Sequence, residues 1–447
     1  MPVTTFMTTT RICSSNWSPI SRTDRCRQRS LLTSAATRWR RTPLWRRTAL
    51  YSVLFMMGAD MFLAPMLIPA MADEFGAQIP HTALIVAAFG ASYAISSPLL
   101  TGLLSSRSSW AVIGGGLPIV VLACVVAAHS HDLAMLTAAR AASGLGAAIV
   151  NPAVWSQLNT TAPQNVGAKA MLGGTAASAA GQVVAIPLGA ILSVAIGWRV
   201  VFLALAVGFL LVWAATVLAA ARENPAVKET ISPGAVRGIL DGLRLWQLPI
   251  FSCTVAGNIT AQAARLGTFA YASAQFSSWY GITGARLGII GIVAGAGSLA
   301  GAVVATTTVA RWRRRGWPVL GFILTSVAVM FVGIALMTAP ISAPLSLIGL
   351  GLNFAAGTIT FGAGQFFLST IFPGNRTAMS WNSSAMYIGA AVGTFTLGIT
   401  DLAPGPFMVI SLAFVVISAL SFSATMVLSR HSPAIADTPP DTSMAAR

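Results

Sequence analysis

Residues 48–71 read TALYSVLFMMGADMFLAPMLIPAM, a run in which Asp60 is the one formally charged side chain. About 20 residues of α-helix cross a hydrocarbon layer roughly 30 Å thick. This stretch is therefore long and apolar enough to span a membrane once. Its carboxyl group then lies near the middle of the span, where ionisable side chains are rare and usually functional.

The composition of the whole chain predicts many such spans. Of 447 residues, 55% are hydrophobic and 9% are charged, whereas soluble domains average about 25% charged residues. The mean hydropathy is +0.75. These values exclude a soluble enzyme, a disordered protein and a secreted disulfide scaffold, and they predict an all-α membrane protein.

Twelve apolar runs reach the length of a spanning helix. Short breaks rich in Pro, Gly and Asp separate most of them. The predicted transmembrane helices are 48–71, 80–104, 110–128, 132–158, 168–195, 198–221, 249–276, 284–309, 317–339, 342–371, 376–400 and 404–428.

The positions of the cations support this number of spans. If the N-terminus is cytoplasmic, 23 of the 27 Lys and Arg residues fall in segments on the cytoplasmic side. Cytoplasmic loops of membrane proteins are enriched in these residues. We therefore expect a multi-pass protein of the cell membrane (inner or plasma membrane) with both termini in the cytoplasm.

A long loop divides the twelve spans into two six-helix halves. The expected segments are a basic disordered tail at 1–47, an N-terminal half at 48–221, an inter-half loop at 222–248, a C-terminal half at 249–428 and a disordered tail at 429–447. Within the loop, residues 236–246 have apolar positions at helical spacing, which predicts a helix on the membrane surface. Two repeated halves with a site between them are typical of secondary transporters.

Several motifs then carry a family resemblance. Span four contains Arg140-Ala-Ala-Ser-Gly144-Leu-Gly146, and span five contains Pro187-Leu-Gly189. In span one an acidic residue precedes two prolines. With these features the chain resembles the major facilitator superfamily, and most of all its twelve-span bacterial drug:proton antiporters and sugar-efflux permeases. The resemblance covers all but the tails and implies the major facilitator fold.

The loop after span two matches the family pattern only in part. The family usually has Gly-x-x-x-Asp-Arg-x-Gly there, and Gly102 and Arg107 match it, but Ser106 replaces the Asp and Ser109 the second Gly. In the family that Asp helps to latch the inner gate, so the departure concerns the latch and not the fold. The resemblance implies a conformational role for Gly102, Arg107, Gly144, Gly146, Pro187 and Gly189.

Three ionisable side chains fall well inside the spans, namely Asp60, Arg140 and Arg265. Each costs about 2.5–3.5 kcal/mol at a helix centre, so each must face the protein interior, water or another charge. We predict that Asp60 and Arg140 form the proton- and charge-coupling site. The alternative is a static buried ion pair.

Uncharged polar residues indicate where the substrate cavity lies. Asn258, Gln262 and Arg265 share one face of span seven at i, i+4, i+7 spacing, which suggests a cavity wall that meets an anionic or hydroxylated group. The resemblance implies that spans one, four, seven and ten line the central cavity. It adds three candidates that could instead hold helices together: Asn151, Asn353 and Gln365.

The predicted function is export of a small organic compound (drug, metabolite or sugar-like) by alternating access, with proton antiport as the drive. No Gly-x4-Gly-Lys-Ser/Thr motif is present, which argues against ATP as the energy source. Proton-coupled or facilitated uptake of a metabolite is the alternative within transport. A polytopic membrane sensor without transport activity is the alternative from another class.

Other chemistry has little support in the sequence. The interiors of the spans hold one Asp and no His, and the four Cys form no Cys-x-x-Cys pair, so we predict no enzyme, no metal and no cofactor. Much of the net charge of +16 comes from ten Arg in residues 1–47. We expect that tail to bind anionic lipids and not nucleic acid. We expect a monomer whose partners are its substrate, protons and the bilayer.

Overall fold

The structure is a computed structural model that describes residues 44–104, 107–161, 164–221, 242–315, 317–372 and 376–430. Several predictions concern residues outside these ranges. The tail at 1–43, the loop at 222–241, the C-terminal residues 431–447 and Ser106 lie outside the described residues.

All secondary-structure elements in the described residues are helices, and each predicted span corresponds to one long helix. The helices are α2 (Leu44–Phe75), α3 (Ile79–Leu103), α4 (Ser109–Ala128), α5 (Leu133–Thr161), α6 (Gln164–Ala195), α7 (Trp198–Ala221), α9 (Pro249–Ala270), α10 (Ala272–Tyr280), α11 (Gly288–Arg314), α12 (Val319–Thr338), α13 (Ala343–Ile371), α14 (Arg376–Gly398) and α15 (Pro404–Arg430). The short α10 continues α9, and two single 3-10 turns, η1 (Leu245–Gln247) and η2 (Gly284–Leu287), precede α9 and α11. The prediction of an all-α fold with twelve long helices is confirmed.

Ten of the described helices are long and apolar enough to cross a membrane. The long helices α9 and α14 fall outside this set because both carry polar side chains along their length. The two pack against each other, and nearly all of α9 beyond Asn258 is buried. A span that does not face lipid tolerates polar residues, since it meets protein on every side.

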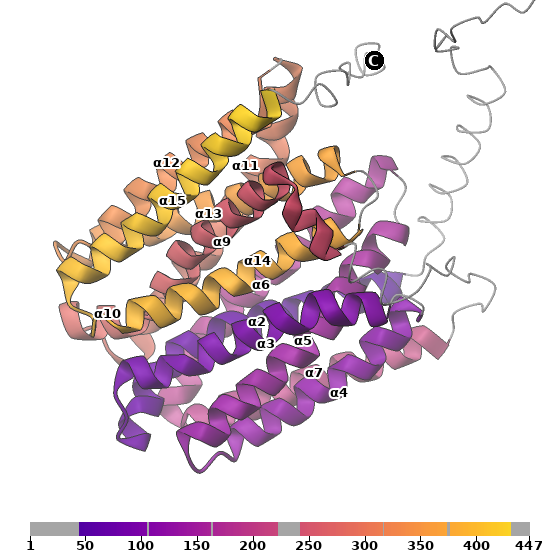
Figure 1. The fold of residues 1–447 in the computed structure, drawn as a ribbon. Coiled ribbons are helices and arrows are strands. Elements are labelled where there is room, and N and C mark those ends of the chain that lie inside the picture. The colour runs from indigo at the N-terminus through magenta and orange to yellow at the C-terminus, as the bar shows by residue number, and fades with distance from the viewer. Residues whose placement is uncertain are drawn as a thin grey trace, which may run out of the picture.

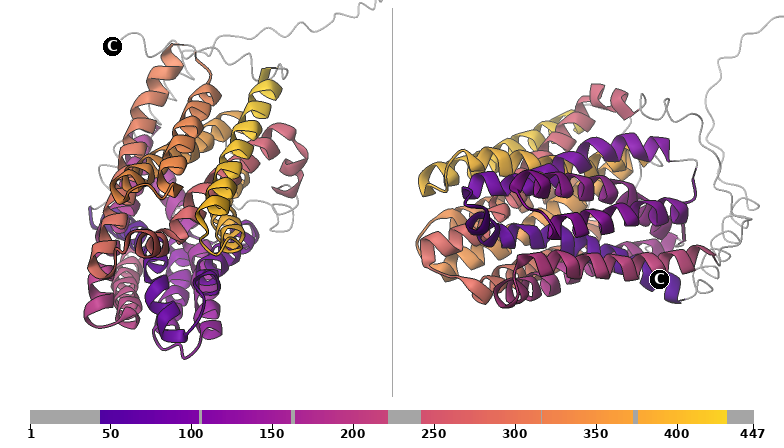
Figure 2. Two further views of the ribbon diagram at one scale, coloured as in Figure 1. Left: turned by 90° about the vertical axis from the view of Figure 1, so that its left-hand side faces the viewer. Right: turned by 90° about the horizontal axis from the view of Figure 1, so that it is seen from below.

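The helices form two bundles that lie side by side. Figure 1 shows α2 to α7, coloured indigo to magenta, next to α9 to α15, coloured red to yellow. In both views of Figure 2 the long helices run roughly along one direction, as membrane spans must. The division of the chain into two separate domains stays a prediction.

The loops lie at two ends of the bundles. We call the end at which α2 begins and α15 finishes the basic face, because its described residues include Arg46, Arg47, Arg107, Arg244, Arg311, Arg315 and Arg430. The opposite face holds the acidic residues Asp73, Glu74, Asp132 and Asp401. There Glu74 accepts a hydrogen bond from the indole of Trp198 and forms an ion pair with Arg199, which ties α2 to α7.

The bundles contact each other between α3 and α14, α6 and α11, and α2 and α10. Small residues make the close approach possible. A Cβ on Gly288 would lie 3.0 Å from the Cα of Pro187, and a Cβ on Gly291 or Gly295 would overlap Ile186 or Val183. Ser273 of α10 donates to the Pro65 carbonyl at 2.8 Å. These contacts extend from the opposite face to the middle of the helices and close that side.

The predicted surface helix at 236–246 is described only from residue 242 onward. Residues 242–244 are helical and continue into η1. Leu245 is buried, and the Trp246 ring packs edge-on against Phe251 and Trp381. This end of the loop is therefore packed against α9 and α14, and the surface helix over residues 236–246 stays a prediction.

Candidate functional site: a buried ion pair between the helical bundles

Asp60 lies on α2 where that helix packs tightly against α6. A Cβ on Gly58 would overlap the Ser178 carbonyl, and a Cβ on Gly181 would overlap the Phe55 carbonyl. Glycine at both positions therefore brings the two backbones into contact. Asp60 follows Gly58 by two residues and is only 1% exposed.

The partner of Asp60 is Arg140 of α5. The Arg140 Nη1 donates to Asp60 Oδ1 at 2.6 Å, and both side chains are nearly free of solvent contact. Ser143, one turn along α5, donates to the other carboxylate oxygen at 3.2 Å. Both oxygens of Asp60 are thus hydrogen-bonded, as a buried carboxylate requires.

Aromatic rings cover the arginine of this pair. The Arg140 guanidinium lies 4.6 Å from the Phe89 ring centroid and 5.9 Å from that of Phe202. Both are cation–π distances. Gly144 lies one turn along α5, and because a Cβ there would overlap the Phe89 carbonyl, this glycine lets α3 bring Phe89 to the guanidinium. The Arg140 Nε has no hydrogen-bond partner.

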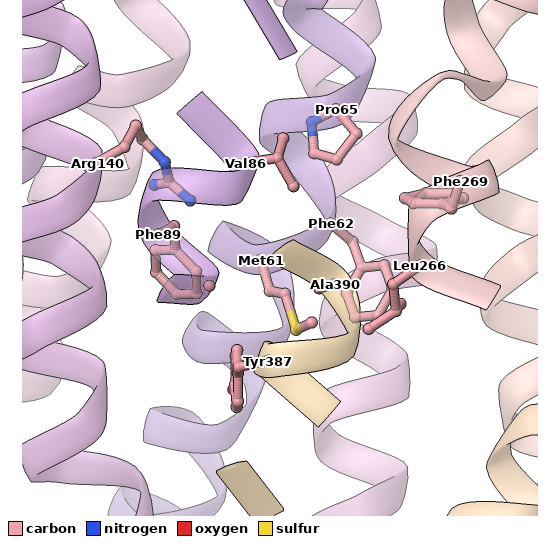
Figure 3. Close-up of a pocket in the computed structure, with 11 residues that line it drawn as sticks. Met61, Phe62, Pro65, Val86, Phe89, Arg140, Leu266, Phe269, Tyr387 and Ala390 are labelled. Atoms are coloured by element: carbon pink, nitrogen blue, oxygen red, sulfur yellow. The ribbon is translucent and has the colours of Figure 1, made fainter. Parts of the chain in front are cut away.

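Arg140 lines a small cavity between the bundles (Figure 3). Its volume is about 20 Å³, enough for about one water molecule. The wall is otherwise mostly apolar and comes from α2, α3, α5, α9 and α14: Met61, Phe62, Pro65, Val86, Phe89, Gly90, Arg140, Leu266, Phe269, Tyr387 and Ala390.

Two tyrosines join the bundles beside this cavity. The rings of Tyr93 on α3 and Tyr387 on α14 stack with centroids 3.5 Å apart. The Asn151 amide donates to the Tyr93 hydroxyl at 3.3 Å and to the Tyr387 hydroxyl at 3.5 Å. Asn151 therefore lies at the junction of the halves, as expected, but it contacts tyrosines and does not line the cavity.

A second polar cluster lies inside the C-terminal bundle. The Asn258 amide donates to Asn382 at 2.8 Å, and the Asn382 amide donates to Gln365 at 2.5 Å. Asn353 donates to the Thr268 hydroxyl at 3.4 Å. These bonds join α9, α13 and α14, and they match the helix–helix alternative that the sequence left open for Asn353 and Gln365.

Arg265 shares the predicted face of α9 with Gln262. Its guanidinium donates to Gln262 Oε1 at 3.4 Å and to Ser298 Oγ at 3.1 Å, and it lies 4.6 Å from the Phe354 ring centroid. Gln262 in turn donates to the Gly357 carbonyl at 3.4 Å. The side chain of Arg265 is 5% exposed.

The small cavity is lined by residues of α2, α3, α5, α9 and α14. None of the six predicted substrate residues is among them, and their role as substrate contacts stays a prediction. The sequence analysis also missed the stacking of Tyr93 on Tyr387, because no pattern within one sequence indicates that two aromatic residues on distant helices meet.

Four of the six predicted motif residues, Gly144, Gly146, Pro187 and Gly189, occupy packing positions. A Cβ on Gly146 would meet Val120, and one on Gly189 would meet Leu63. Pro187 packs against Gly288 across the two bundles. Gly102 is near the end of α3, and Arg107 is exposed at the basic face. Among the described residues, no group of three or more His, Cys, Asp or Glu could hold a metal ion.

The chain was compared with known families and proteins. The family model described as Major Facilitator Superfamily matches residues 50–394. An uncharacterized MFS-type transporter, YceJ of Bacillus subtilis (strain 168), is 25% identical over 354 residues, which cover 78% of this chain and 87% of the relative. A chloramphenicol resistance protein of Streptomyces lividans is 24% identical over 386 residues, which cover 85% of this chain and 95% of the relative.

Two solved structures have the same fold. The nucleoside transporter NupG superposes with a TM-score of 0.66 at 14% identity, over 86% of this chain and 99% of its own. A bacterial homologue of the human lysosomal transporter Spinster, in an inward-facing and unoccupied conformation, gives a TM-score of 0.66 at 13% identity, over 87% and 98%. With the family match, the helical bundles and the membrane-spanning helices in agreement, this chain belongs to the major facilitator superfamily of membrane transporters.

Proposed function

We propose that the protein exports a small organic compound by alternating access, driven by protons that move the other way through Asp60. The observation that carries this proposal is the ion pair of Asp60 with Arg140, which is buried in the middle of the spans and borders the cavity between the bundles. A charged pair at that depth is retained at a cost in stability. Such pairs mark ion and proton pathways in transporters.

Protonation of Asp60 gives the pair a way to couple to substrate. The charged Asp60 accepts hydrogen bonds from Arg140 and, at 3.2 Å, from Ser143, and a donor group of the substrate can replace the longer of these bonds. Protonation neutralises the carboxylate and weakens its bond to that group. Proton and substrate therefore compete for Asp60, as antiport requires.

The direction of transport is supported by one relative. The Streptomyces lividans protein, which aligns over 85% of this chain, is called a chloramphenicol resistance protein. Resistance by a transporter follows from export of the drug. We therefore take chloramphenicol as the first compound to test.

The alternating motion is supported by how the bundles meet. Contacts between α6 and α11 and between α2 and α10 close the opposite face. These contacts involve small residues and few hydrogen bonds, so a rocking motion that separates the two bundles breaks few favourable interactions. We propose that the opposite face is extracytoplasmic and that this conformation is closed to the outside.

The same proposal covers location and partners. The described cations gather at the basic face, which fits the cytoplasmic side of a bacterial inner or plasma membrane with both termini inside. Arg46 and Arg47 at the start of α2 are placed to bind anionic lipid headgroups. The proposed unit is a monomer that transports its substrate without catalysing a chemical reaction.

Everted membrane vesicles that contain the wild-type protein and a fluorescent pH probe test this function. Chloramphenicol added to energised vesicles should move protons out of the lumen, and Asp60→Asn should abolish the signal at equal protein abundance. Asp73→Asn, which removes an acid at the opposite face, is the matched control and should retain the proton signal. A panel of drugs and sugars that gives no proton movement, or full activity in Asp60→Asn, would falsify the proposal.

A further inference from the structure

Arg265 is a buried cation with no counter-ion among the described residues. Within the ranges that the structure describes, the ion pairs join Arg140 to Asp60 and Arg199 to Glu74. Arg265 bonds only to the neutral oxygens of Gln262 and Ser298, and its Nε has no partner. The other described acids, Asp73, Asp132 and Asp401, lie at the opposite face.

The two buried arginines, Arg140 and Arg265, therefore have different surroundings. Arg140 is neutralised by Asp60 at 2.6 Å, whereas Arg265 has neutral hydrogen bonds of 3.1 and 3.4 Å and one aromatic face. An unpaired charge in a low-dielectric interior destabilises the protein. It persists where a ligand supplies the missing charge, because functional sites are kept at the expense of stability.

Aromatic rings separate Arg265 from the cavity. Phe62, Phe269 and Phe354 pack edge to face, with centroids 4.9 to 5.9 Å apart. Phe62 and Phe269 line the cavity, and Arg265 lies against Phe354. Figure 3 shows Phe62 beside Phe269 and Leu266 at the side of the cavity away from Arg140.

These rings come from both bundles. Phe62 belongs to α2, and Phe269 and Phe354 belong to α9 and α13. A movement that separates the bundles must pull Phe62 from the other two rings. A second link also crosses the boundary, since Ser298, which accepts from Arg265, donates to Gln182 of α6 at 3.3 Å. The same movement breaks the bond between Ser298 and Gln182, while Arg265 and Ser298 stay together in the C-terminal bundle.

We propose that Arg265 binds the negatively charged group of the transported compound, and that the Phe62–Phe269–Phe354 cluster opens to admit that group when the bundles separate. The preferred substrates are accordingly organic anions that pair a carboxylate with an apolar ring, so chloramphenicol, which is neutral, serves only as the first compound to test. The cation supplies the charge that recognises it and the phenylalanines supply its apolar contact. This inference rests on the proposed transport function and adds the chemistry of the substrate.

Thermal unfolding of the purified full-length protein in detergent tests the site without transport. Benzoate and 4-nitrobenzoate serve as anionic probes, and benzamide and 4-nitrobenzamide are the neutral controls of the same shape, all at one ionic strength. A ligand that binds only the folded state raises the unfolding midpoint with its concentration. We expect the carboxylates to stabilise the wild type, and Arg265→Gln to weaken that binding by about tenfold or more.

The unfolding midpoint without ligand separates a binding role from a structural one. Arg265→Gln should keep or raise this midpoint because it removes an unpaired charge, whereas Arg140→Gln should lower it because it leaves Asp60 unpaired. Arg265→Lys keeps a charge and should retain part of the carboxylate binding.

Carboxylates that stabilise the wild type no more than their amides overturn the proposal. So does equal stabilisation of Arg265→Gln, or a lower midpoint of that variant without ligand. Proton movement in vesicles is a separate measurement, so loss of antiport with retained carboxylate binding would reject the transport mechanism alone.

Discussion

At the scale of single residues, the pairing of Asp60 with Arg140 decides how the protein holds charge in the bilayer. Beside the pair, Ser143 donates to Asp60 and two aromatic rings lie against Arg140. The sequence predicted both residues because a charge inside an apolar run stands out. The sequence left two roles open for the pair, a static buried ion pair and a proton-coupling site. The geometry supports the ion pair itself, which both roles require.

Arg140→Gln should lower the free energy of unfolding by about 3–5 kcal/mol, because it leaves the Asp60 carboxylate buried and unpaired. The measurement is the loss of structure of the purified protein in detergent with rising denaturant. Asp60→Asn with Arg140→Gln removes both charges and should recover much of the loss. A double variant no more stable than Arg140→Gln would show that the charge pairing is not what stabilises this region.

At the scale of helices, close packing between α3 and α5 positions the arginine and its aromatic cover. Gly144 is the contact point, since a Cβ there would overlap the Phe89 carbonyl. Gly144→Ala should therefore lower stability by about 1–3 kcal/mol through overpacking.

Gly115→Ala is the matched control for this packing. Nothing lies within 4 Å of a Cβ at Gly115 on α4, so this change should stabilise the protein by about 0.5–1 kcal/mol through helix propensity. Chemical unfolding of the two variants side by side provides the comparison. If Gly144→Ala proved as stable as Gly115→Ala, the inferred close packing between α3 and α5 would be wrong.

The helices were predictable where lipid contact sets the composition. All twelve spans were predicted as apolar runs, including α9 and α14, which do not pass a simple hydropathy criterion, and the positions of the cations supported this number. Partners across the bundles were not predictable. Tyr93 with Tyr387 and Ser298 with Gln182 meet only through tertiary packing, and one sequence without related sequences carries no signal of that contact.

At the scale of the whole molecule, the bundles are held together on one side. The bonded side chains of Gln182 and Ser298 lie on α6 and α11, which face each other across the boundary. Gln182→Cys with Ser298→Cys, joined by a short cleavable thiol reagent, should stop transport by preventing separation, and cleavage should restore it. The single-cysteine variants treated alike are the controls, and transport that continues through the cross-link would contradict the rocking motion.

The proton role of Asp60 can be isolated in proteoliposomes loaded with labelled chloramphenicol. The comparison is between movement driven by a pH gradient and one-for-one exchange of labelled for unlabelled compound without a gradient. If Asp60 carries the proton, Asp60→Asn loses gradient-driven movement, because the amide takes up no proton. Exchange without a gradient falls with it, because the neutral amide mimics the protonated acid that has released its substrate. Gradient-driven movement at the wild-type rate in Asp60→Asn would contradict the mechanism.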